Sequence, residues 1–393
     1  MSAFHSAGAD AFRLPSDLHY LNCAYMSPLP REVEAAGILG IRRKRNPSGI
    51  RPPDFFQETE ELRSLYGGLL EGVESDSVAV LPAVSYGVAV AARNAGSLKG
   101  RNVVVARDQF PGNVYAWMAG ARRQGGELRM VDPPPSSASG EGRGAGWSRR
   151  LAEAIDEQTA VVALGPVHWA DGTRFDLEAV GARAREVGAL LVVDATQSLG
   201  ADPFPMTSVR PDAVISAAYK WLLGPYSMAL GYFGERIQGG IPLEEGWITR
   251  AGSQDFRGLV DYTEAYAPGA IRYDVGERSN FILTPMTVAG LRLVHQWTPR
   301  RIREHCAALT GPLARTLREE GHQVEEERWR APHILGVRLR EGVDMERVRM
   351  SLEHRNVHVS LRGDAVRISP HVYNGPEDMA ALVEGLREAA AGS

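Results

Sequence analysis

Lysine is rare in this chain, and one lysine lies within an apolar stretch. Only three of the 44 Lys and Arg residues are lysines, and Lys220 occurs in the segment AAYKWLLGP. A lysine amine attacks carbonyl compounds to form a Schiff base, and apolar surroundings keep enough of it deprotonated to do so. Tyr219, Trp221 and Leu222 provide such surroundings. Two roles are open for Lys220: a Schiff-base nucleophile, or a buried stem whose ammonium group stays in water.

A carboxylate favours the first role. Asp194 follows the apolar run ALLVV, where the carboxyl end of a strand is expected, and ligands bind at that edge of open α/β sheets. It suits a magnesium ligand, a helix N-cap, or the partner that keeps a pyridine nitrogen protonated. No phosphate loop of the type GxxxxGK[ST] accompanies it, which weighs against magnesium and nucleotides. Asp194 and Lys220 together therefore indicate pyridoxal 5′-phosphate (PLP) as the cofactor.

The phosphate of such a cofactor needs a site of its own. The segment PAVSYGVAV reads as a strand end followed by an apolar helix, with Ser85 and Tyr86 at the junction. Free backbone N–H groups at the start of a helix bind phosphate. We therefore expect the phosphate here, with a plain serine cap of the helix as the alternative reading.

Short apolar strands alternate with helical stretches through most of residues 75–235. Strands are expected at 77–81, 102–106, 127–131, 160–164, 189–193, 213–216 and 229–233. Helices are expected at 85–95, 113–124, 148–156 and 177–187. This alternation predicts an α/β fold with a parallel sheet covered by helices. The tract 132–147, rich in Pro, Ser and Gly, reads as a surface excursion.

The sequence pattern changes near residue 286. Two helical segments, several short strands and a final helix follow, which is typical of a smaller α+β domain. We therefore expect an N-terminal segment at 1–20, a large cofactor-binding domain at 21–285 and a small C-terminal domain at 286–393.

Composition excludes several classes of protein. The formal net charge of −4 leaves no basic excess for a nucleic-acid backbone, so no nucleic-acid partner is expected. The two cysteines, Cys23 and Cys306, fit neither a disulfide framework nor a zinc-type spacing, and no metal site is expected. No run of 18 apolar residues indicates a membrane span. These features predict a cytoplasmic protein without a membrane partner.

The segments VVDATQS and AYKWLLGP together resemble the class V aminotransferase family of PLP-dependent enzymes, which groups aminotransferases, cysteine desulfurases, kynureninases and isopenicillin N epimerases. The resemblance extends over roughly residues 20–380. It implies fold type I, with a mainly parallel seven-stranded sheet in a large domain and a smaller α+β C-terminal domain. It also implies that Lys220 forms the Schiff base, that Asp194 faces the pyridine nitrogen, that Gln197 hydrogen-bonds the ring oxygen and that Ser85 lies at the phosphate.

Two further segments resemble parts of the cofactor site. DQFPGNVY is similar to the kynureninase-like stretch in which a phenylalanine stacks on the pyridine ring, which assigns that role to Phe110. In VHWADGT, Asp171 stands about where many relatives carry an asparagine near the cofactor, so we expect Asp171 beside the cofactor. Ala217 departs from the family, because relatives often have a serine or threonine there in contact with phosphate.

Two segments resemble parts of the family dimer and of the substrate site. RYDVGERSNF resembles the segment that reaches the cofactor phosphate of the partner subunit, which assigns Ser279 and Asn280 and implies a homodimer with its active site at the interface. VRISPHVYN looks like the stretch whose arginine holds the α-carboxylate of an amino acid substrate by a two-pronged salt bridge, and this indicates Arg367.

The cysteines bear on the type of reaction. Desulfurases that relay sulfur as a persulfide carry a cysteine in the loop before the carboxylate arginine, and the stretch NVHVSLRGDAVRIS has none. Cys23 reads as a small buried residue. The overall sequence resembles the desulfurase, kynureninase and epimerase branch of the family, and this resemblance favours β-elimination, of a C–S lyase type without a persulfide relay. Transamination to a keto acid and a non-catalytic PLP-binding regulator are the alternatives.

Overall fold

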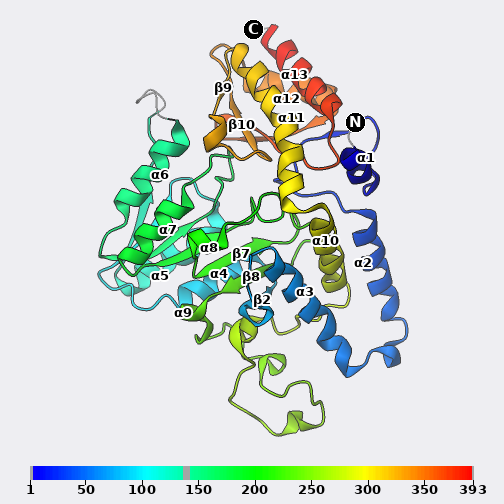
Figure 1. Ribbon diagram of the computed structural model, residues 1–393, viewed down its shortest axis with the longest axis vertical. Coiled ribbons are helices and arrows are strands. Elements are labelled where there is room, and N and C mark those ends of the chain that lie inside the picture. Colours follow the sequence, from blue (N-terminus) through cyan, green and yellow to red (C-terminus); the bar gives the residue numbers. More distant parts are fainter. Residues whose placement is uncertain (1–2, 136–141, 392–393) are drawn as a thin grey trace.

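The computed structural model describes residues 3–135 and 142–391. The strands of its large sheet are β2 (Val78–Leu81), β3 (Asn102–Ala106), β4 (Glu127–Val131), β5 (Thr159–Leu164), β6 (Leu190–Asp194), β7 (Ala213–Ala217) and β8 (Ala229–Phe233). They lie in the order β2-β8-β7-β6-β5-β3-β4 (Figure 1). Strands β3 to β7 run parallel, and β8 runs antiparallel to both of its neighbours. All seven expected strands are confirmed, each within one residue at either end.

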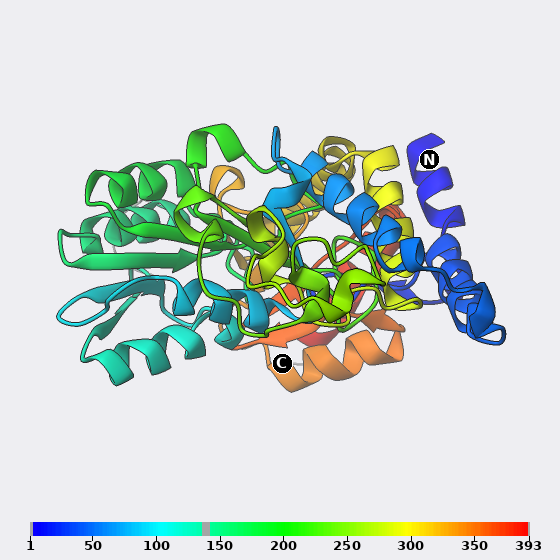
Figure 2. The same ribbon diagram turned by 90° about the horizontal axis from the view of Figure 1, so that it is seen from below.

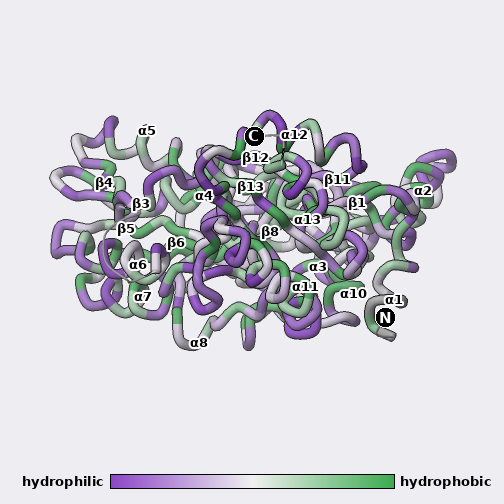
Figure 3. Tube along the Cα trace, turned by 90° about the horizontal axis from the view of Figure 1, so that it is seen from above, coloured by the Kyte–Doolittle hydropathy of each residue, from purple (hydrophilic) through white to green (hydrophobic). Residues whose placement is uncertain are grey.

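Helices cover both faces of this sheet (Figure 2). Val103 and Val105 of β3 point into a core shared with α4 (Val84–Arg93) and α5 (Tyr115–Gln124). Val104, between them, points to the other face, which α3 (Gln57–Gly68), α6 (Arg143–Ala154) and α7 (Leu177–Glu186) help to cover. Because both faces are buried, the central strands are almost continuously apolar, as the hydropathy colours of β6 show (Figure 3), whereas the edge strand β4 contains Glu127 and Arg129 and is only partly buried.

The remaining described elements belong to the two ends of the chain and to short connections. They are α1 (Ala3–Asp10), β1 (His19–Tyr20), α2 (Arg31–Arg43), α8 (Met206–Val209), α9 (Glu235–Gln238), α10 (Leu283–Trp297), α11 (Pro299–Glu319), β9 (Gln323–Val324), β10 (Leu335–Arg338), α12 (Met345–His354), β11 (Val357–His358), β12 (Ser360–Arg362), β13 (Ala365–Ile368) and α13 (Pro376–Ala391). Within the described residues, no helix combines the length and hydropathy needed to cross a bilayer.

The C-terminal part forms a four-stranded antiparallel sheet in the order β12-β13-β10-β9, with helices α11, α12 and α13 packed around it (Figure 1). The N-terminal strand β1 pairs in parallel with β11, and helix α2 packs along α10. The start of the chain is therefore part of the same structure as its end. The domain limits of 1–20, 21–285 and 286–393 remain predictions.

The tract 132–147 is not a surface excursion over its whole length. Residues 136–141 lie outside the described residues, but α6 begins at Arg143 and the side chain of Trp147 is fully buried. The Trp147 indole donates to the carbonyl oxygen of Val131 at 2.8 Å. Gly144 allows this packing, because a Cβ there would lie 2.7 Å from the side chain of Trp329. The expectation was wrong for residues 143–147, where Gly144 serves close helix packing and not a loop.

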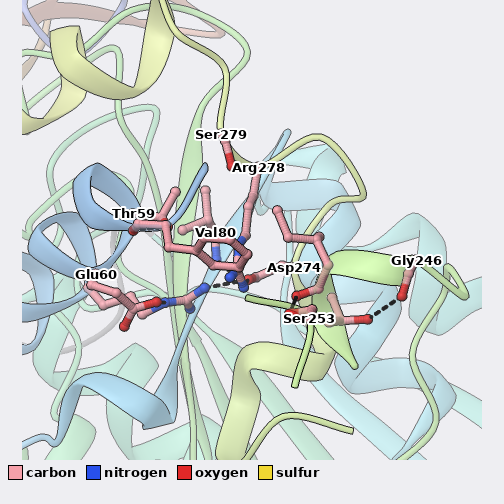
Figure 4. Close-up of polar contacts among 12 residues, drawn as sticks. Thr59, Glu60, Val80, Gly246, Ser253, Asp274, Arg278 and Ser279 are labelled. Atoms are coloured by element: carbon pink, nitrogen blue, oxygen red, sulfur yellow. Dashed lines mark hydrogen bonds and ion pairs between the residues drawn. The ribbon is translucent and has the colours of Figure 1, made fainter. Parts of the chain in front are cut away.

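A buried ion cluster links α3, β2 and the segment before α10 (Figure 4). The carboxylate of Asp274 pairs with the guanidinium groups of Arg63 and Arg278, and its Oδ1 accepts a hydrogen bond from the backbone N–H of Val80 at 2.8 Å. All three charged side chains are almost fully buried. The cluster therefore determines where the chain enters the segment that contains Ser279.

We expect Asp274→Ala to lower the free energy of unfolding by about 3–5 kcal/mol, because it removes the buried carboxylate from two buried guanidinium groups and leaves Arg63 only the partly exposed Glu60 at 3.5 Å. Urea unfolding followed by circular dichroism measures this. Glu61→Ala is the control, since its ion pair with Arg292 is exposed and is worth at most about 1 kcal/mol. Equal effects of the two substitutions would contradict the structural role of Asp274.

Candidate active site

A cavity of about 280 Å³ opens at the carboxyl edge of the large sheet. Its walls come from segments that follow five strands: 82–85 after β2, 109–113 after β3, 165–169 after β5, 194–197 at the end of β6, and 217–220 at the end of β7. The carboxyl ends of parallel strands meet at one edge, where open α/β sheets bind ligands. The cavity brings together Ser85, Phe110, Asp194, Gln197 and Lys220 from the predicted set.

Lys220 is buried at this site. The residue is only 5% exposed, and its Nζ lies 5.5 Å from the ring centroid of Phe110. Burial lowers the pKa of the Lys220 amine to about 8, and the charge of Arg367 acts in the same direction, while Asp194 opposes it. About a fifth of the amine is therefore neutral at pH 7.4, against about a thousandth for an ordinary lysine, and the neutral form is the nucleophile. The alternative reading, with the ammonium group in water, does not fit this burial.

Asp194 ends β6 and faces the cavity. Its Oδ1 accepts a hydrogen bond from the backbone N–H of Thr196 at 3.0 Å, and among the described residues it forms no ion pair. Burial raises the pKa of this carboxyl group, so a cationic ligand group would stabilise its charged form. No helix begins at Asp194, so the cap reading is wrong. Thr196, which the sequence analysis missed, also accepts from the backbone N–H of Ala217 at 3.2 Å and thereby joins the ends of β6 and β7.

The start of α4 forms another wall of the cavity. Ala83 is the N-cap residue, and Val84 and Ser85 occupy the first turn, whose N–H groups have no partner within the helix. The position therefore suits a phosphate. Tyr86 differs from the expectation: its ring packs on the apolar core beneath α4 and does not line the cavity. A helical residue next to Ser85 points about 100° away from it, which explains the error.

Gln197 is held in one orientation. Its Oε1 accepts from the indole N–H of Trp221 at 3.2 Å, and its Nε2 donates to the carbonyl oxygen of Ala24 at 3.0 Å. An indole only donates and a carbonyl only accepts, so the two contacts fix the amide. The imidazole of His333 donates from Nε2 to the backbone carbonyl of Gln197 at 2.7 Å. The second amide N–H of Gln197 remains for a ligand, which matches the predicted bond to a ring oxygen.

Phe110 lies at the mouth of the cavity and packs edge-on against Trp169, with ring centroids 5.5 Å apart. The carbonyl oxygen of Asp108 accepts from the Trp169 indole at 2.7 Å and contacts Nε2 of His168 at 3.1 Å. These bonds hold the segment that carries Phe110. Stacking of Phe110 on a cofactor ring stays a prediction. His168 and Trp169 line the cavity although the sequence analysis did not single them out.

Asp171 does not lie beside the cofactor site, contrary to expectation. It is absent from the cavity lining, and its carboxylate contacts Nδ1 of His168 at 3.2 Å and accepts from Arg338 at 2.9 Å. Gly172, with φ of +75°, turns the chain directly after it. The turn directs Asp171 toward the C-terminal strands, while Trp169, two residues earlier, reaches the cavity.

Ser279 and Asn280 lie outside the cavity of their own chain. The hydroxyl of Ser279 donates to the carbonyl oxygen of Phe55, and Oδ1 of Asn280 accepts from the backbone N–H groups of Ile282 and Leu283 at the start of α10. Their contact with the cofactor of a partner subunit stays a prediction.

Arg367 is buried behind Trp169, outside the cavity lining. It is 1% exposed, and it donates to the carbonyl oxygen of Trp169 at 2.7 Å and to the hydroxyl of Ser360 at 3.2 Å. Cys23 is fully buried, as expected, and burial raises the pKa of its thiol to about 12. Among the described residues, no group of three or more His, Cys, Asp or Glu side chains is arranged to hold a metal ion.

Comparison with known proteins defines the family. The profile of the family described as Aminotransferase class-V matches residues 54–382, so the chain belongs to this family and is a PLP-dependent enzyme. It is 24% identical to the uncharacterized aminotransferase YcbU of Bacillus subtilis, over 86% of this chain and 85% of that protein. It is 25% identical to a probable cysteine desulfurase of Methanothermobacter thermautotrophicus, over 94% of each chain. A kynureninase of Pseudomonas fluorescens is 28% identical over 76% of this chain and 70% of its own.

Solved structures show the same fold. The cysteine desulfurase CsdA of Escherichia coli superposes with a TM-score of 0.80 at 16% identity, covering 100% of this chain and 99% of its own. The cystine C–S lyase C-DES, in complex with cysteine persulfide, gives a TM-score of 0.81 at 18% identity and covers 94% and 97%. These likenesses confirm the fold predicted from the sequence, a mostly parallel seven-stranded sheet with a smaller C-terminal domain.

PLP fits the groups that the cavity presents. Among the described residues the buried carboxylate of Asp194 forms no ion pair, the start of α4 offers backbone N–H groups, and Gln197 offers an amide N–H. The amine of Lys220 lies within the same lining. These four groups would hold the pyridine nitrogen, the phosphate, the ring oxygen and the aldehyde carbon, respectively.

Covalent attachment of PLP to apoprotein should depend on pH as the Lys220 amine does. Because the pKa is lowered to about 8, we expect the attachment rate to rise between pH 7 and pH 9 and then level off. With an ordinary lysine, whose pKa is about 10.4, the rate of PLP attachment would still be rising at pH 10.

Visible absorbance after rapid mixing measures the rate, and borohydride trapping identifies the lysine. Lys220→Ala should trap no PLP, whereas Lys99→Ala, which removes an exposed lysine, should behave as the unmodified protein. Trapping at another lysine, or a rate that climbs steadily beyond pH 10, would refute the assignment.

Proposed function

We propose that the protein is a PLP-dependent lyase that eliminates a substituent from Cβ of an amino acid, with cleavage of a C–S bond as the best candidate, and that it uses no persulfide relay. The proposal that no persulfide relay is used rests on the burial of the two cysteines. The chain has two, and both Cys23 and Cys306 are fully buried. Neither lies in the loop before Arg367, so no accessible thiol is available to accept sulfur from a substrate.

The relatives support the proposed elimination with cleavage of a C–S bond. A probable cysteine desulfurase and a kynureninase align with most of this chain, and a cystine C–S lyase shares its fold. Transamination is the second candidate, because the relative in Bacillus subtilis is named an aminotransferase. The alternative of a non-catalytic regulator is not retained, because the family is one of enzymes.

The residues of the chain divide the work of such a reaction. When bound, PLP supplies an electron sink for the electron pair released at the substrate Cα. The amine of Lys220, partly neutral because of its burial, takes the proton from Cα as a general base. The carboxylate of Asp194 holds a proton on the pyridine nitrogen by charge attraction. Arg367 binds the α-carboxylate, and Phe110 restrains the plane of the ring.

Incubation of the PLP-loaded protein with a panel of amino acids, cysteine and cystine included, tests the proposal. We expect keto acid to appear together with the released β-substituent, while the visible spectrum of the PLP form is retained. Conversion to the pyridoxamine form, reversed by a keto acid, would instead identify an aminotransferase.

We further propose that the protein acts in the cytoplasm as a homodimer. Large apolar side chains are exposed, among them Phe110 and Tyr226 at the cavity, and such patches mark interaction surfaces. Free, buried thiols suit a reducing compartment. Light scattering of the purified protein should give twice the chain mass, and a monomer would refute the dimer. Cell fractionation tests the location.

A further inference from the structure

Two arginines lie on the same face of the C-terminal sheet. Strands β12 and β13 are antiparallel, and Ser360 lies directly opposite Arg367. Arg362, two residues after Ser360 on β12, shares its face because side chains alternate along a strand. Arg362 and Arg367 are therefore diagonal neighbours across the strand pair, at a spacing of about 7–8 Å that long side chains can span.

Both arginines are attached to Trp169, a residue of the cavity wall. Arg367 donates to its carbonyl oxygen at 2.7 Å, and the guanidinium carbon of Arg362 lies 5.6 Å from the centroid of its ring. The shared contact places both guanidinium groups next to Trp169, behind the wall that this residue forms and outside the residues that line the cavity. Burial, then Arg367 and to a smaller extent Arg362, lower the pKa of Lys220, which agrees with this placement.

Neither guanidinium group has an anion to balance it. Among the described residues, Arg362 and Arg367 form no ion pair, and the Nε–H of each is buried without an acceptor. The nearest acidic residue in sequence, Asp364, pairs with Arg338 instead. Arg362 makes one hydrogen bond, to the backbone carbonyl of Leu361 at 2.9 Å. Arg367 is almost fully buried and Arg362 is half-buried, and a buried cation without a counter-ion is costly, so the pair suits an anionic ligand.

The α-carboxylate of an amino acid supplies one negative charge, whereas two guanidinium groups, those of Arg362 and Arg367, lack a counter-ion among the described residues. We propose that the substrate carries a second anionic group in its side chain, a carboxylate or a similar oxyanion, and that Arg362 binds this group while Arg367 binds the α-carboxylate. The inference rests on the proposed function in one respect, namely that the ligand is an amino acid held by Arg367. Arg362 is then a specificity-determining residue.

Binding of two unreactive acids to the PLP-loaded protein tests this directly. Succinate and butyrate have the same four-carbon length, but only succinate has a second carboxylate, and neither carries an amino group. We expect calorimetric titration to give an affinity for succinate at least roughly tenfold higher, the effect of one charge-assisted hydrogen bond. Arg362→Gln should abolish this preference and leave the affinity for butyrate within about twofold, since Arg367 is intact.

Arg347→Gln, on the exposed face of α12, is the matched control and should change neither affinity. Arg362→Lys keeps the charge and should retain part of the preference, which guards against a folding defect of the glutamine variant. Equal binding of the two acids by the unmodified protein would overturn the proposal. An equal loss of affinity for succinate and for butyrate in Arg362→Gln would also overturn the proposal, because both arginines would then bind the same carboxylate. Neither acid reacts, so the result is independent of whether keto acid is released from amino acids.

Discussion

Burial of the Lys220 amine is the physical condition on which the chemistry of this protein depends. An exposed lysine is almost wholly protonated at neutral pH and neither attacks an aldehyde nor accepts a proton from carbon. Here removal from water and the positive charge of Arg367 weaken the hold on the proton, while Asp194 strengthens it. The same burial that makes the amine reactive would be costly for its charged form, so reactivity and folding are coupled at this residue.

The surroundings of Lys220 are built by three parts of the chain that are far apart in sequence. Gln197 comes from the large sheet, its amide is held by Ala24 near the N-terminus, and its carbonyl group accepts from His333 in the C-terminal part. Ala24 in turn donates its backbone N–H to the hydroxyl of Ser369, after β13. The C-terminal part therefore contributes to the geometry of the cofactor site, and a shift of that part would change the position of Gln197.

Charge divides the cavity into two regions. The side formed by Asp194 and the start of α4 suits the ring nitrogen and the phosphate of PLP, whereas Trp169, on another side, contacts Arg367 and Arg362, which form no ion pair among the described residues. A cofactor common to many reactions leaves the choice of substrate to the protein. We propose that in this chain Arg362 and Arg367 make that choice, and both lie outside the segments that resemble the family's cofactor motifs most closely.

The sequence by itself determined the sheet and the central pair of the site. Continuous apolar strands of parallel type are recognisable locally, and Lys220 and Asp194 stand out because a lone lysine in an apolar run and a carboxylate at a strand end are local patterns. Local sequence patterns did not predict the side-chain orientations that depend on packing between distant segments. Asp171 turned away because Gly172 bends the chain there, and Tyr86 turned into the core because of its angle on α4. Only the tertiary structure decided that Trp221 orients Gln197 and that Arg362 and Arg367 share a face, because strand register and side-chain contacts are properties of the folded chain.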